Sequence, residues 1–596
     1  MSVLDRIERL RNVMEQQKID CYIIPTDDYH HSEYVGDYFK FREYITGFTG
    51  SAGTAVFTKD KAGLWTDGRY FIQAEAQLKG SGITLYKSGE PDVPTIEEFL
   101  KSELKEGDVL GFDGRTVTYA QGKRYCHIAD ENGASLKYSL DLAQNIWKER
   151  PEMSMESVFS LADEYTGEKI GSKLERIREI MKENGCNAHV LSSLDDIAWL
   201  LNIRGNDIAY CPLVLSYAIV YNNSVELFAD IRKFSDDIIN LLAENQVKIY
   251  PYEDIYRKVS EMTSEDKLLL DSAIMNYSLY QAISKETVIV DKQNPEILMK
   301  SVKNETQAEN LRKAHLKDAV AHTKFMYWLK KNIGRVEITE LSASARLEGL
   351  RAEQEHFLGP SFGPISAYGE HGAIVHYSAD EKSNVPLKEG KLFMTDTGGH
   401  YLEGSTDITR TVALGEVGNI EKEHFTLVAR AMLRLANTVF LYGCSGANLD
   451  CIAREVFWKE GLNFNHGTGH GVGYLLNIHE GPINFRWKEG ERPAPALEEN
   501  MVITDEPGIY IEGSHGIRLE NELLVRKTVK NEYGQFMNFE ILTYVPIDLD
   551  AILPEKMSTE EKEMLNHYHK QVYEKVSPYL SEEERIWLKE YTRAVK

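Results

Sequence analysis

Apolar residues in the N-terminal half of the chain follow a pattern that occurs twice. Residues 8–14 (ERLRNVM) have the spacing of an amphipathic helix, and a short apolar strand follows them. The same succession returns at residues 175–181 (ERIREIM). A second match, in the same order, links residues 67–71 (DGRYF) to residues 230–234 (DIRKF). The repetition predicts two tandem, related α/β domains.

Two breaks in this pattern divide the chain. Periodicity is lost near residues 149–165 and again near residues 294–296, where a proline interrupts the chain. A long helical stretch then begins at about residue 301 and runs to about residue 331. We therefore expect an N-terminal α/β domain at residues 1–155, a related α/β domain at residues 156–299, and a third domain at residues 300–596.

The third region has a different pattern. Strand-like runs at residues 391–395 and 501–504 alternate with a helical run at residues 421–442, which is typical of an α+β domain. The last stretch of the chain is helical, and two Ser-x-x-Glu signatures, at Ser558 and Ser581, predict helix N-termini within it.

Composition and charge narrow the class of protein. The chain has 68 basic and 93 acidic side chains, a net charge of −25, which argues against nucleic acid or an anionic membrane as a partner. The N-terminus lacks the apolar stretch of a signal peptide, and the longest nearly apolar run, residues 211–221, is too short to span a bilayer. Six cysteines without a CxxC pair predict buried, reduced thiols. We expect a soluble, cytoplasmic protein.

Carboxylates and histidines gather in short segments of the third region. Asp396 ends a strand-like run and Asp407 follows it closely, although aspartates at strand ends are often turn formers. His466, His470 and His479 lie in or near the glycine-rich segment HGTGHGVG. A phosphate-binding loop or a tight hairpin with exposed histidines would also explain the glycines, but the segment lacks the Gly-Lys-Ser/Thr ending of a P-loop. The three histidines favour a metal or proton-transfer site.

Two glutamates complete the set. Glu506 follows an apolar run and precedes a Pro-Gly turn, and Glu520 lies in an alternating segment that also contains Arg518. The alternation predicts that Glu520 and Arg518 share one face of a strand, so a salt bridge between them is the simplest alternative.

Taken together, Asp396, Asp407, His470, Glu506 and Glu520 are hard or borderline ligands without a thiolate. Such a set suits a pair of Mn²⁺, Co²⁺, Fe²⁺ or Zn²⁺ ions better than a structural zinc site. Two such ions can hold a bridging hydroxide, which is a strong nucleophile at neutral pH.

These motifs resemble the dinuclear site of the pita-bread metallopeptidases, a superfamily that includes methionine aminopeptidase, prolidase and aminopeptidase P. The segments HGTGHGVG, NIHEGP and TDEPG resemble those of the aminopeptidase P (Xaa-Pro aminopeptidase) family. The likeness extends to residues 47–53 (GFTGSAG), 65–71 (WTDGRYF) and 196–205 (DIAWLLNIRG). It covers nearly the whole chain and matches the long, three-domain cytosolic form, which is commonly a homodimer.

The resemblance implies a ligand set for each of two divalent ions, with Mn²⁺ the first expectation and Co²⁺ or Zn²⁺ the alternatives. Asp396, Asp407 and Glu520 would hold one ion. Asp407, His470, Glu506 and Glu520 would hold the other, so that Asp407 and Glu520 bridge. Glu506 would also take the proton of the nucleophilic water.

Further roles are implied for residues that contact the substrate. His376 and His479 would orient the scissile carbonyl and stabilise the oxyanion. His466 would lie beside the proline ring, and His470, Glu506 and Arg518 would also contact the substrate. Arg69 matches a peptide-binding position in the first domain, which implies that this domain, from the same or the partner subunit, reaches over the cleft.

The function implied by the resemblance is release of the N-terminal residue from peptides with proline in the second position. The nearest alternative is prolidase, which cleaves only Xaa-Pro dipeptides. A binding protein that kept the fold and lost catalysis is a third reading, but such proteins are expected to lack ligands, and here all five are present.

Overall fold

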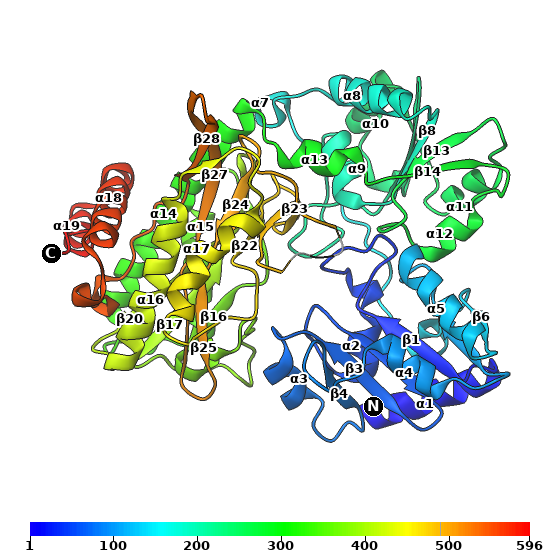
Figure 1. The fold of residues 1–596 in the computed structure, drawn as a ribbon, viewed down its shortest axis with the longest axis horizontal. Coiled ribbons are helices and arrows are strands. Elements are labelled where there is room, and N and C mark those ends of the chain that lie inside the picture. Colours follow the sequence, from blue (N-terminus) through cyan, green and yellow to red (C-terminus); the bar gives the residue numbers. More distant parts are fainter. Residues whose placement is uncertain (489, 491) are drawn as a thin grey trace. The chain divides into compact units, whose positions relative to one another are not determined.

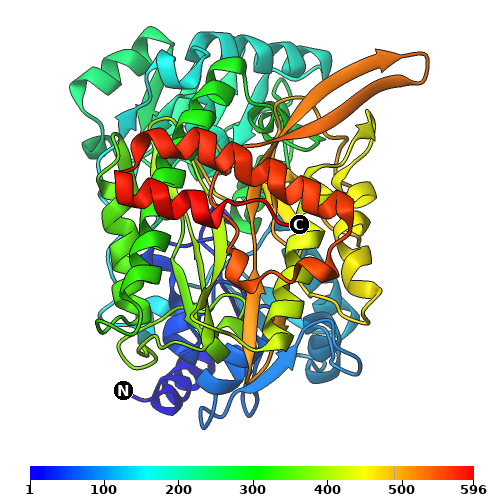
Figure 2. The same cartoon turned by 90° about the vertical axis from the view of Figure 1, so that its left-hand side faces the viewer.

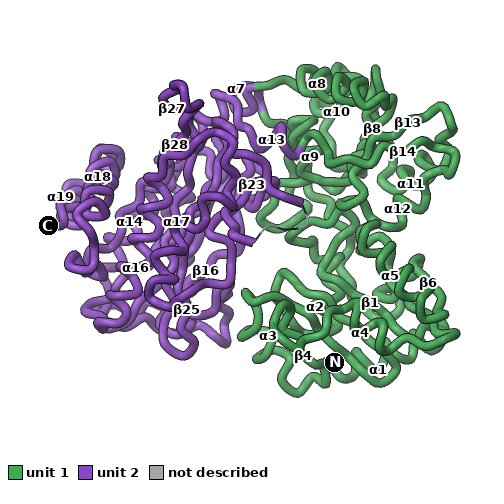
Figure 3. The backbone as a smooth tube through the Cα atoms, in the orientation of Figure 1, with its two compact units in different colours: residues 1–161, 168–296 green, residues 162–167, 297–596 purple. Residues whose placement is uncertain are grey.

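The computed structural model describes residues 1–488, 490 and 492–596, and these form two compact units (Figure 3). The units comprise residues 1–161 with 168–296 and residues 162–167 with 297–596. The first unit holds two six-stranded sheets, and the second holds an α+β arrangement (Figure 1). The predicted fold class is therefore confirmed, whereas the domain limits at residues 155 and 299 stay predictions.

The first sheet has the strand order β4-β3-β2-β1-β5-β6. Side chains of β1 alternate between two cores. Tyr22 and Ile24 pack with α1 (Val3–Gln16), and Cys21 and Ile23 pack with α4 (Ile96–Glu103) and α5 (Tyr119–Glu131). Helices therefore cover both faces of the sheet. Its strands are β1 (Cys21–Pro25), β2 (Thr54–Thr58), β3 (Ala62–Thr66), β4 (Thr84–Lys87), β5 (Val109–Phe112) and β6 (Ser135–Lys137).

The second sheet repeats this topology in the order β12-β11-β10-β8-β13-β14. β8 takes the place of β1, because it is antiparallel to one neighbour and parallel to the other. The repeated helical motif lies in α1 and in α8 (Ile170–Glu183). Two related α/β domains were predicted, and the shared topology confirms them. The strands are β8 (Ala188–Leu191), β10 (Tyr217–Tyr221), β11 (Val225–Phe228), β12 (Val247–Tyr250), β13 (Lys267–Leu270) and β14 (Val288–Asp291).

The second repeated segment also folds alike in both copies. It follows β3 in the first domain and β11 in the second. In each copy an arginine donates two hydrogen bonds to the aspartate two residues earlier. Arg69 Nε and Nη2 lie 2.8 Å from the oxygens of Asp67, and Arg232 Nε and Nη2 lie 2.9 and 2.5 Å from those of Asp230. The likeness thus reaches the level of side-chain geometry.

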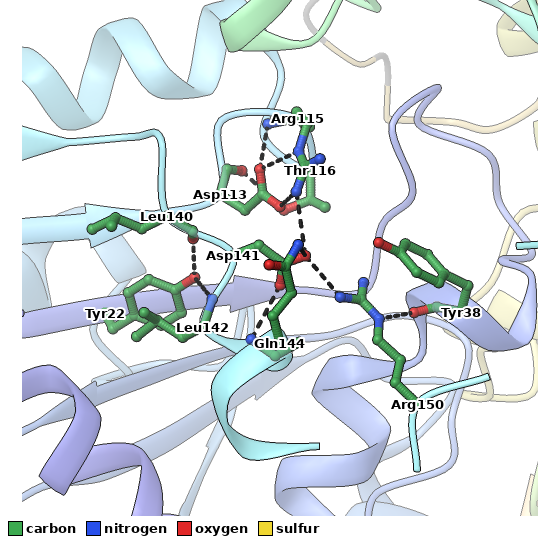
Figure 4. A network of polar contacts seen from close by, with 11 residues as sticks. Tyr22, Tyr38, Asp113, Arg115, Thr116, Leu140, Asp141, Leu142, Gln144 and Arg150 are labelled. Atoms are coloured by element: carbon green, nitrogen blue, oxygen red, sulfur yellow. Dashed lines mark hydrogen bonds and ion pairs between the residues drawn. The ribbon is translucent and has the colours of Figure 1, made fainter. Parts of the chain in front are cut away.

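A polar network fastens the end of the first domain to its sheet (Figure 4). Asp141 accepts hydrogen bonds from Arg150 Nη1 at 2.7 Å and Arg115 Nη2 at 3.3 Å. The Tyr22 hydroxyl, which comes from the central strand β1, donates to the carbonyl of Leu140 at 2.6 Å. Because these groups are largely withdrawn from water, charge-assisted bonds here hold the segment more firmly than exposed ones would.

The second unit has a large hydrophobic core, to which its helices and strands both contribute, and a smaller cluster around Ile365 and Met394 (Figure 1). The long helices are α14 (Glu305–Asn332), α15 (Glu340–Ala352), α16 (Asn419–Ala436) and α17 (Gly446–Trp458). One sheet has the order β16-β17-β20, and a six-stranded sheet has the order β21-β28-β27-β24-β22-β23. Their strands are β16 (Ile365–Tyr368), β17 (Lys391–Thr397), β20 (Ile408–Leu414), β21 (Phe440–Leu441), β22 (Gly469–Gly471), β23 (Glu480–Phe485), β24 (Val502–Asp505), β27 (Asn521–Asn531) and β28 (Gly534–Ile541).

Two helices at the C-terminus, α18 (Thr559–Val576) and α19 (Glu582–Tyr591), pack against α14 (Figure 2). Both begin at the predicted positions, where Ser558 and Ser581 form capping boxes with Glu561 and Glu584. Inside, α18 meets the fully buried Arg410, which donates to the Tyr568 hydroxyl at 2.7 Å and to the carbonyl of Glu520 at 2.5 Å. One guanidinium thus connects the C-terminal helices to the strands of the core.

Several expected elements differ in the structure. The predicted helix at residues 421–442 spans Asn419–Ala436, where the side chain of Asn437 caps the Leu433 carbonyl, and β21 follows. Only Tyr217–Tyr221 of the apolar run at residues 211–221 forms a strand. The six cysteines are unpaired, as predicted, but only Cys21, Cys186 and Cys211 are buried. Cys126 and Cys444 are partly buried, and Cys451, on α17, is exposed. None of the described helices is long and apolar enough to cross a bilayer.

We expect Tyr568→Phe to lower the free energy of unfolding by about 1 kcal/mol, because it removes the buried hydroxyl that accepts from Arg410 and donates to the Val545 carbonyl. Denaturant unfolding checks this value. Tyr579→Phe is the control, since that side chain is 58% exposed. Equal stability of the two variants would contradict the proposed importance of the buried hydroxyl.

Candidate metal centre

Strand ends in the second unit bring acidic and imidazole side chains together. Asp396 lies near the end of β17, Asp407 directly before β20, His470 in β22, Glu506 directly after β24 and Glu520 directly before β27. Three overlapping groups have ligand atoms within 4.8 Å of one another: Asp396 with Asp407 and Glu520, His470 with Glu506 and Glu520, and Asp407 with His470 and His479. The five residues expected to bind metal thus meet at one place, together with His479.

Strand pairing sets the position of the acidic groups. Asp396 is opposite Thr409 in the antiparallel pair β17–β20. The backbone of Glu520 donates to the Thr409 carbonyl at 3.1 Å, and the Thr409 hydroxyl donates to Glu520 Oε2 at 2.7 Å. A single threonine therefore aligns residues that are far apart in the sequence.

The imidazole of His470 is oriented by its own strand. Its Nδ1 lies 2.9 Å from the carbonyl of Gly471, so Nδ1 must carry the proton and donate. Nε2 then presents its lone pair toward the carboxylates, 3.5 Å from Asp407 Oδ2 and 3.7 Å from Glu506 Oε1. A backbone carbonyl fixes the tautomer of many metal-binding histidines in this way.

The glycines around His470 are explained by close approach of neighbouring strands. A Cβ on Gly469 would lie 1.9 Å from the carbonyl oxygen of Thr504, and one on Gly471 would lie 2.3 Å from that of Glu480. Only glycine allows β22 to pack this closely between β23 and β24. Strand packing thus accounts for the glycines without the phosphate loop that the sequence left open.

The buried carboxyl groups of this cluster favour binding of a cation. Burial, together with the neighbouring carboxylates, raises the pKa of Asp407 and of Glu520 well above the usual range. Burial also raises the pKa of Glu506. Asp396 Oδ1 is buried and makes no hydrogen bond within the described part of the chain. Oxygen and imidazole donors with an orphaned buried carboxylate oxygen fit divalent cations such as Mn²⁺, Co²⁺ or Zn²⁺.

Arg518 is a positively charged side chain that contacts the acidic cluster directly. It donates from Nη2 to Asp396 Oδ2 and from Nη1 to the Tyr510 hydroxyl at 2.8 Å. Arg518 and Glu520 lie on the same side, as the alternation predicts, since both contact the Thr409 hydroxyl, at 3.3 and 2.7 Å. They do not share one strand, because β26 (His515–Arg518) ends before Glu520, and Arg518 pairs with Asp396. A partner on β17 could not be inferred from local alternation.

Tyr510, in β25 (Gly508–Ile511), extends this chain of hydrogen bonds to His466. The Tyr510 hydroxyl lies 2.8 Å from His466 Nε2, and His466 Nδ1 lies 2.7 Å from the Gly467 carbonyl. Burial lowers the pKa of His466 to about 3, so the ring is neutral and accepts from the tyrosine. Sequence reasoning missed Tyr510, although its period-two spacing from Glu506 was a usable signal.

Glu522 and His315 support the backbone of Asp407, and the sequence analysis did not predict this pair. Glu522 Oε1 accepts from the backbone N–H of Asp407 at 2.6 Å, and its Oε2 lies 3.1 Å from His315 Nε2. All of these side chains are buried. The alternation of Glu522 with Glu520 was the available signal, whereas His315, on α14, had none.

The expected substrate-contacting residues lie in both compact units: His376 and His479 belong to the second unit and Arg69 to the first. His479 stacks edge-on against His470, with ring centroids 4.3 Å apart. His376 follows η3 (Gly369–Ala373), and the preceding carbonyl, that of Val375, accepts from Arg518 Nη2 at 3.3 Å. Arg69 belongs to the other compact unit, so its expected role at this centre stays a prediction.

Comparison with known families agrees with this architecture. The model of the creatinase/prolidase N-terminal domain matches residues 6–137, and a second model of that domain matches residues 149–307. The model of metallopeptidase family M24 matches residues 309–527, and that of the C-terminal region of peptidase M24 matches residues 535–595. The fold and the centre thus define a metallopeptidase of the pita-bread type with two creatinase-type domains before it.

Relatives match along the whole chain. Xaa-Pro aminopeptidase 1 of Dictyostelium discoideum is 36% identical over 97% of this chain and 94% of its own length, and aminopeptidase P1 of Arabidopsis thaliana is 35% identical over 99% of each. The crystal structure of X-prolyl aminopeptidase from Caenorhabditis elegans, a cytosolic enzyme with a di-nuclear active site, is 34% identical and covers all of both chains with a TM-score of 0.95. The chain belongs to the Xaa-Pro aminopeptidase family.

Removal of divalent ions should make stability depend on pH. A carboxyl group whose pKa is higher in the folded protein than in the unfolded one stabilises the fold at low pH. This contribution is lost as the pH rises from about 4 through the folded value. Since Asp407, Glu506 and Glu520 all have raised pKa values, we expect the melting temperature of chelator-treated protein to fall as the pH rises.

Adding Mn²⁺ should reverse this loss, and the gain in melting temperature should be larger at about pH 8 than at about pH 6, because binding displaces protons. Scanning calorimetry measures both series. Asp407→Ala serves as the control that should not respond. A gain in melting temperature that is independent of pH, or equal in the variant, would contradict the assignment of these carboxylates.

Proposed function

We propose that the protein is a metal-dependent aminopeptidase that releases the N-terminal residue from peptides with proline at the second position. The observation that carries the proposal is the meeting of five metal-binding side chains, in a chain whose full length matches Xaa-Pro aminopeptidases. The shorter prolidases are the alternative. Full-length similarity to named Xaa-Pro aminopeptidases favours the longer enzyme.

Two divalent ions, Mn²⁺ first and Co²⁺ or Zn²⁺ as alternatives, would be held by two sets of side chains. Asp396, Asp407 and Glu520 form the first set, and Asp407, His470, Glu506 and Glu520 form the second. Such ions would polarise the scissile carbonyl and activate a water molecule. Glu520 belongs to two of the groups whose ligand atoms lie within 4.8 Å of one another, one with Asp396 and one with His470. Asp407 also belongs to two groups, one with Asp396 and one with His470, and this sharing supports a bridging role for Asp407 and Glu520.

Residues of the chain supply the proton transfers. Glu506 is the general base, since burial raises its pKa toward the range in which a carboxylate can take a proton and return it. The His479 ring lies next to His470, with centroids 4.3 Å apart, and its imidazole can orient the scissile carbonyl and stabilise developing negative charge. His376 has the same task from the side of η3.

The chemistry of the Xaa-Pro bond explains why its cleavage needs a dedicated site. An Xaa-Pro bond has no N–H and a fixed φ, so a site that recognises extended peptides through backbone N–H groups rejects it. The neutral His466 ring and the Tyr510 ring, with centroids 5.4 Å apart, provide apolar surface for the pyrrolidine, with Arg518 at its border. Arg69 would contact the peptide further along the chain.

The remaining assignments concern the whole molecule. We infer a cytoplasmic homodimer with domains at residues 1–155, 156–299 and 300–596. The cytosolic description of the Caenorhabditis elegans enzyme supports the location. Peptides are the only partners proposed, because the net charge of −25 disfavours nucleic acid and anionic membranes.

Two peptides distinguish the enzyme classes. We expect the Mn²⁺-loaded protein to release arginine from Arg-Pro-Pro and to leave Ala-Pro largely uncut, because the site has to admit a residue beyond the proline. Liquid chromatography with mass detection measures both products. Cleavage of Ala-Pro alone would identify a prolidase, and cleavage of neither would contradict the proposal.

We expect Glu506→Gln to lower kcat by about 10²- to 10⁴-fold, because the amide cannot take a proton. Steady-state kinetics on Arg-Pro-Pro checks the change, and elemental analysis reports whether both ions are retained. Glu512→Gln, an exposed substitution six residues away, is the matched control. Near-normal turnover of Glu506→Gln with both ions bound would remove Glu506 from the mechanism.

A further inference from the structure

A fully buried carboxylate outside the metal centre holds the segment that carries His376. Glu340 is the first residue of α15 and has no exposed surface. Its Oε1 accepts from the backbone N–H of Tyr368 at 2.8 Å and lies 2.8 Å from His371 Nδ1. Its Oε2 accepts from the Tyr377 hydroxyl at 2.9 Å and from the Val385 N–H at 3.3 Å.

The order of these donors along the chain is informative. Tyr368 and His371 precede His376, Tyr377 follows it directly, and Val385 comes later. One carboxylate therefore fastens the segment before and after His376. The rings of His371 and Tyr377 also stack, with centroids 4.5 Å apart, so the two sides of the segment contact each other next to Glu340.

The opposite side of the segment rests on β26. A Cβ on Gly516 would lie 1.6 Å from the Gly372 carbonyl oxygen, so the two backbones touch directly. Arg518 Nη2 donates to the Val375 carbonyl at 3.3 Å. Because the same guanidinium donates to Asp396, any shift of the segment relative to Glu340 changes the position of His376 with respect to the acidic cluster.

Burial of this carboxylate is costly unless its lone pairs are satisfied. The donors are two backbone amides, a phenol and an imidazole, and the N-terminus of α15 adds its positive dipole end. A fold that needed only stability at this position could use an apolar side chain against the adjoining cluster of Ile365, Ala367 and Met394. Because Glu340 instead accepts from four donors of the segment between Tyr368 and Val385, it fixes the backbone course of that segment.

We propose that Glu340 is a positioning residue that sets the place of His376 against the substrate. The inference rests on the proposed role of His376. It predicts that loss of the carboxylate lowers turnover while both metal ions stay bound, since none of the proposed ligands lies on this segment.

Glu340→Gln is the sharpest substitution. Gln has the size of Glu but one oxygen becomes an NH₂ group, and fixed backbone N–H groups face both positions, from Tyr368 on one side and Val385 on the other. Whichever orientation the amide takes, its NH₂ group faces one of these backbone N–H groups, so two donors oppose each other. We expect kcat/KM for Arg-Pro-Pro to fall by about tenfold to 100-fold, as for a displaced catalytic group. Metal content should remain that of the wild type.

Glu296→Gln is the matched control. Glu296 is also fully buried in the first turn of a helix, α13 (Pro295–Ser301), and its Oε2 lies 3.2 Å from Nε2 of the buried His189. It belongs to the first compact unit, which contributes none of the proposed metal ligands, so the variant should lose thermal stability and keep kcat/KM. If Glu340→Gln behaves like Glu296→Gln, with lower stability and normal kcat/KM, the inference is wrong.

A double-mutant cycle separates this inference from the proposed function. If Glu340 acts through His376, Glu340→Gln lowers kcat/KM in the wild type and has little further effect in His376→Ala. Full activity of His376→Ala would instead overturn the role proposed for His376. Equal losses from Glu340→Gln in both backgrounds would overturn the positioning role alone.

Should Glu340→Gln fail to fold, Tyr377→Phe carries the same test, because it removes the bond to Glu340 directly beside His376, together with a longer contact of the same hydroxyl to the Ser383 carbonyl at 3.3 Å. We expect a smaller loss of kcat/KM that again disappears in His376→Ala. A loss of the same size in both backgrounds, or none in the wild type, would overturn the inference.

Discussion

Repulsion among buried carboxylates is the constraint on which the second unit depends. Asp396, Asp407, Glu506 and Glu520 approach one another where little water can reach them, and their mutual repulsion raises pKa values in the cluster. Arg518 offsets one charge through Asp396. The remainder requires divalent cations or protons. The orientation of His470, the packing of β22 and the bonds behind Asp407 all serve to keep these groups together against that repulsion.

The same constraint explains why the ligands come from strands. Each carboxylate lies at or just beyond a strand end, so its position follows from register: Asp396 opposite Thr409, and Thr504 opposite Glu522. A shift by one residue would turn every such side chain to the other face of its sheet. Rigid pairing therefore keeps the acidic groups close, whereas a loop would let them move apart.

Much of this arrangement could be predicted from the sequence, because the informative features are local. The repeated helix and the capping serines can be recognised from a few neighbouring residues. Several of the proposed metal ligands lie in glycine-rich or proline-containing segments. The partners of these residues are not local. Arg518 and Asp396 are separated by 122 positions, and Glu522 meets His315 from another element altogether. Local alternation thus placed Arg518 and Glu520 on one side but could not identify Asp396 as the partner of Arg518, and it gave no sign of Glu340.

The guanidinium of Arg410 has a consequence for the end of the chain. It donates to the carbonyl of Glu520 and to the hydroxyl of Tyr568, so a proposed metal ligand and helix α18 share one donor. Coupling between two such sites is reciprocal. An ion that favoured this geometry of Glu520 would therefore also favour the docked state of α18, and docking of that helix would favour ion binding to the same extent. The C-terminal helices are in this sense an outer layer of the metal centre.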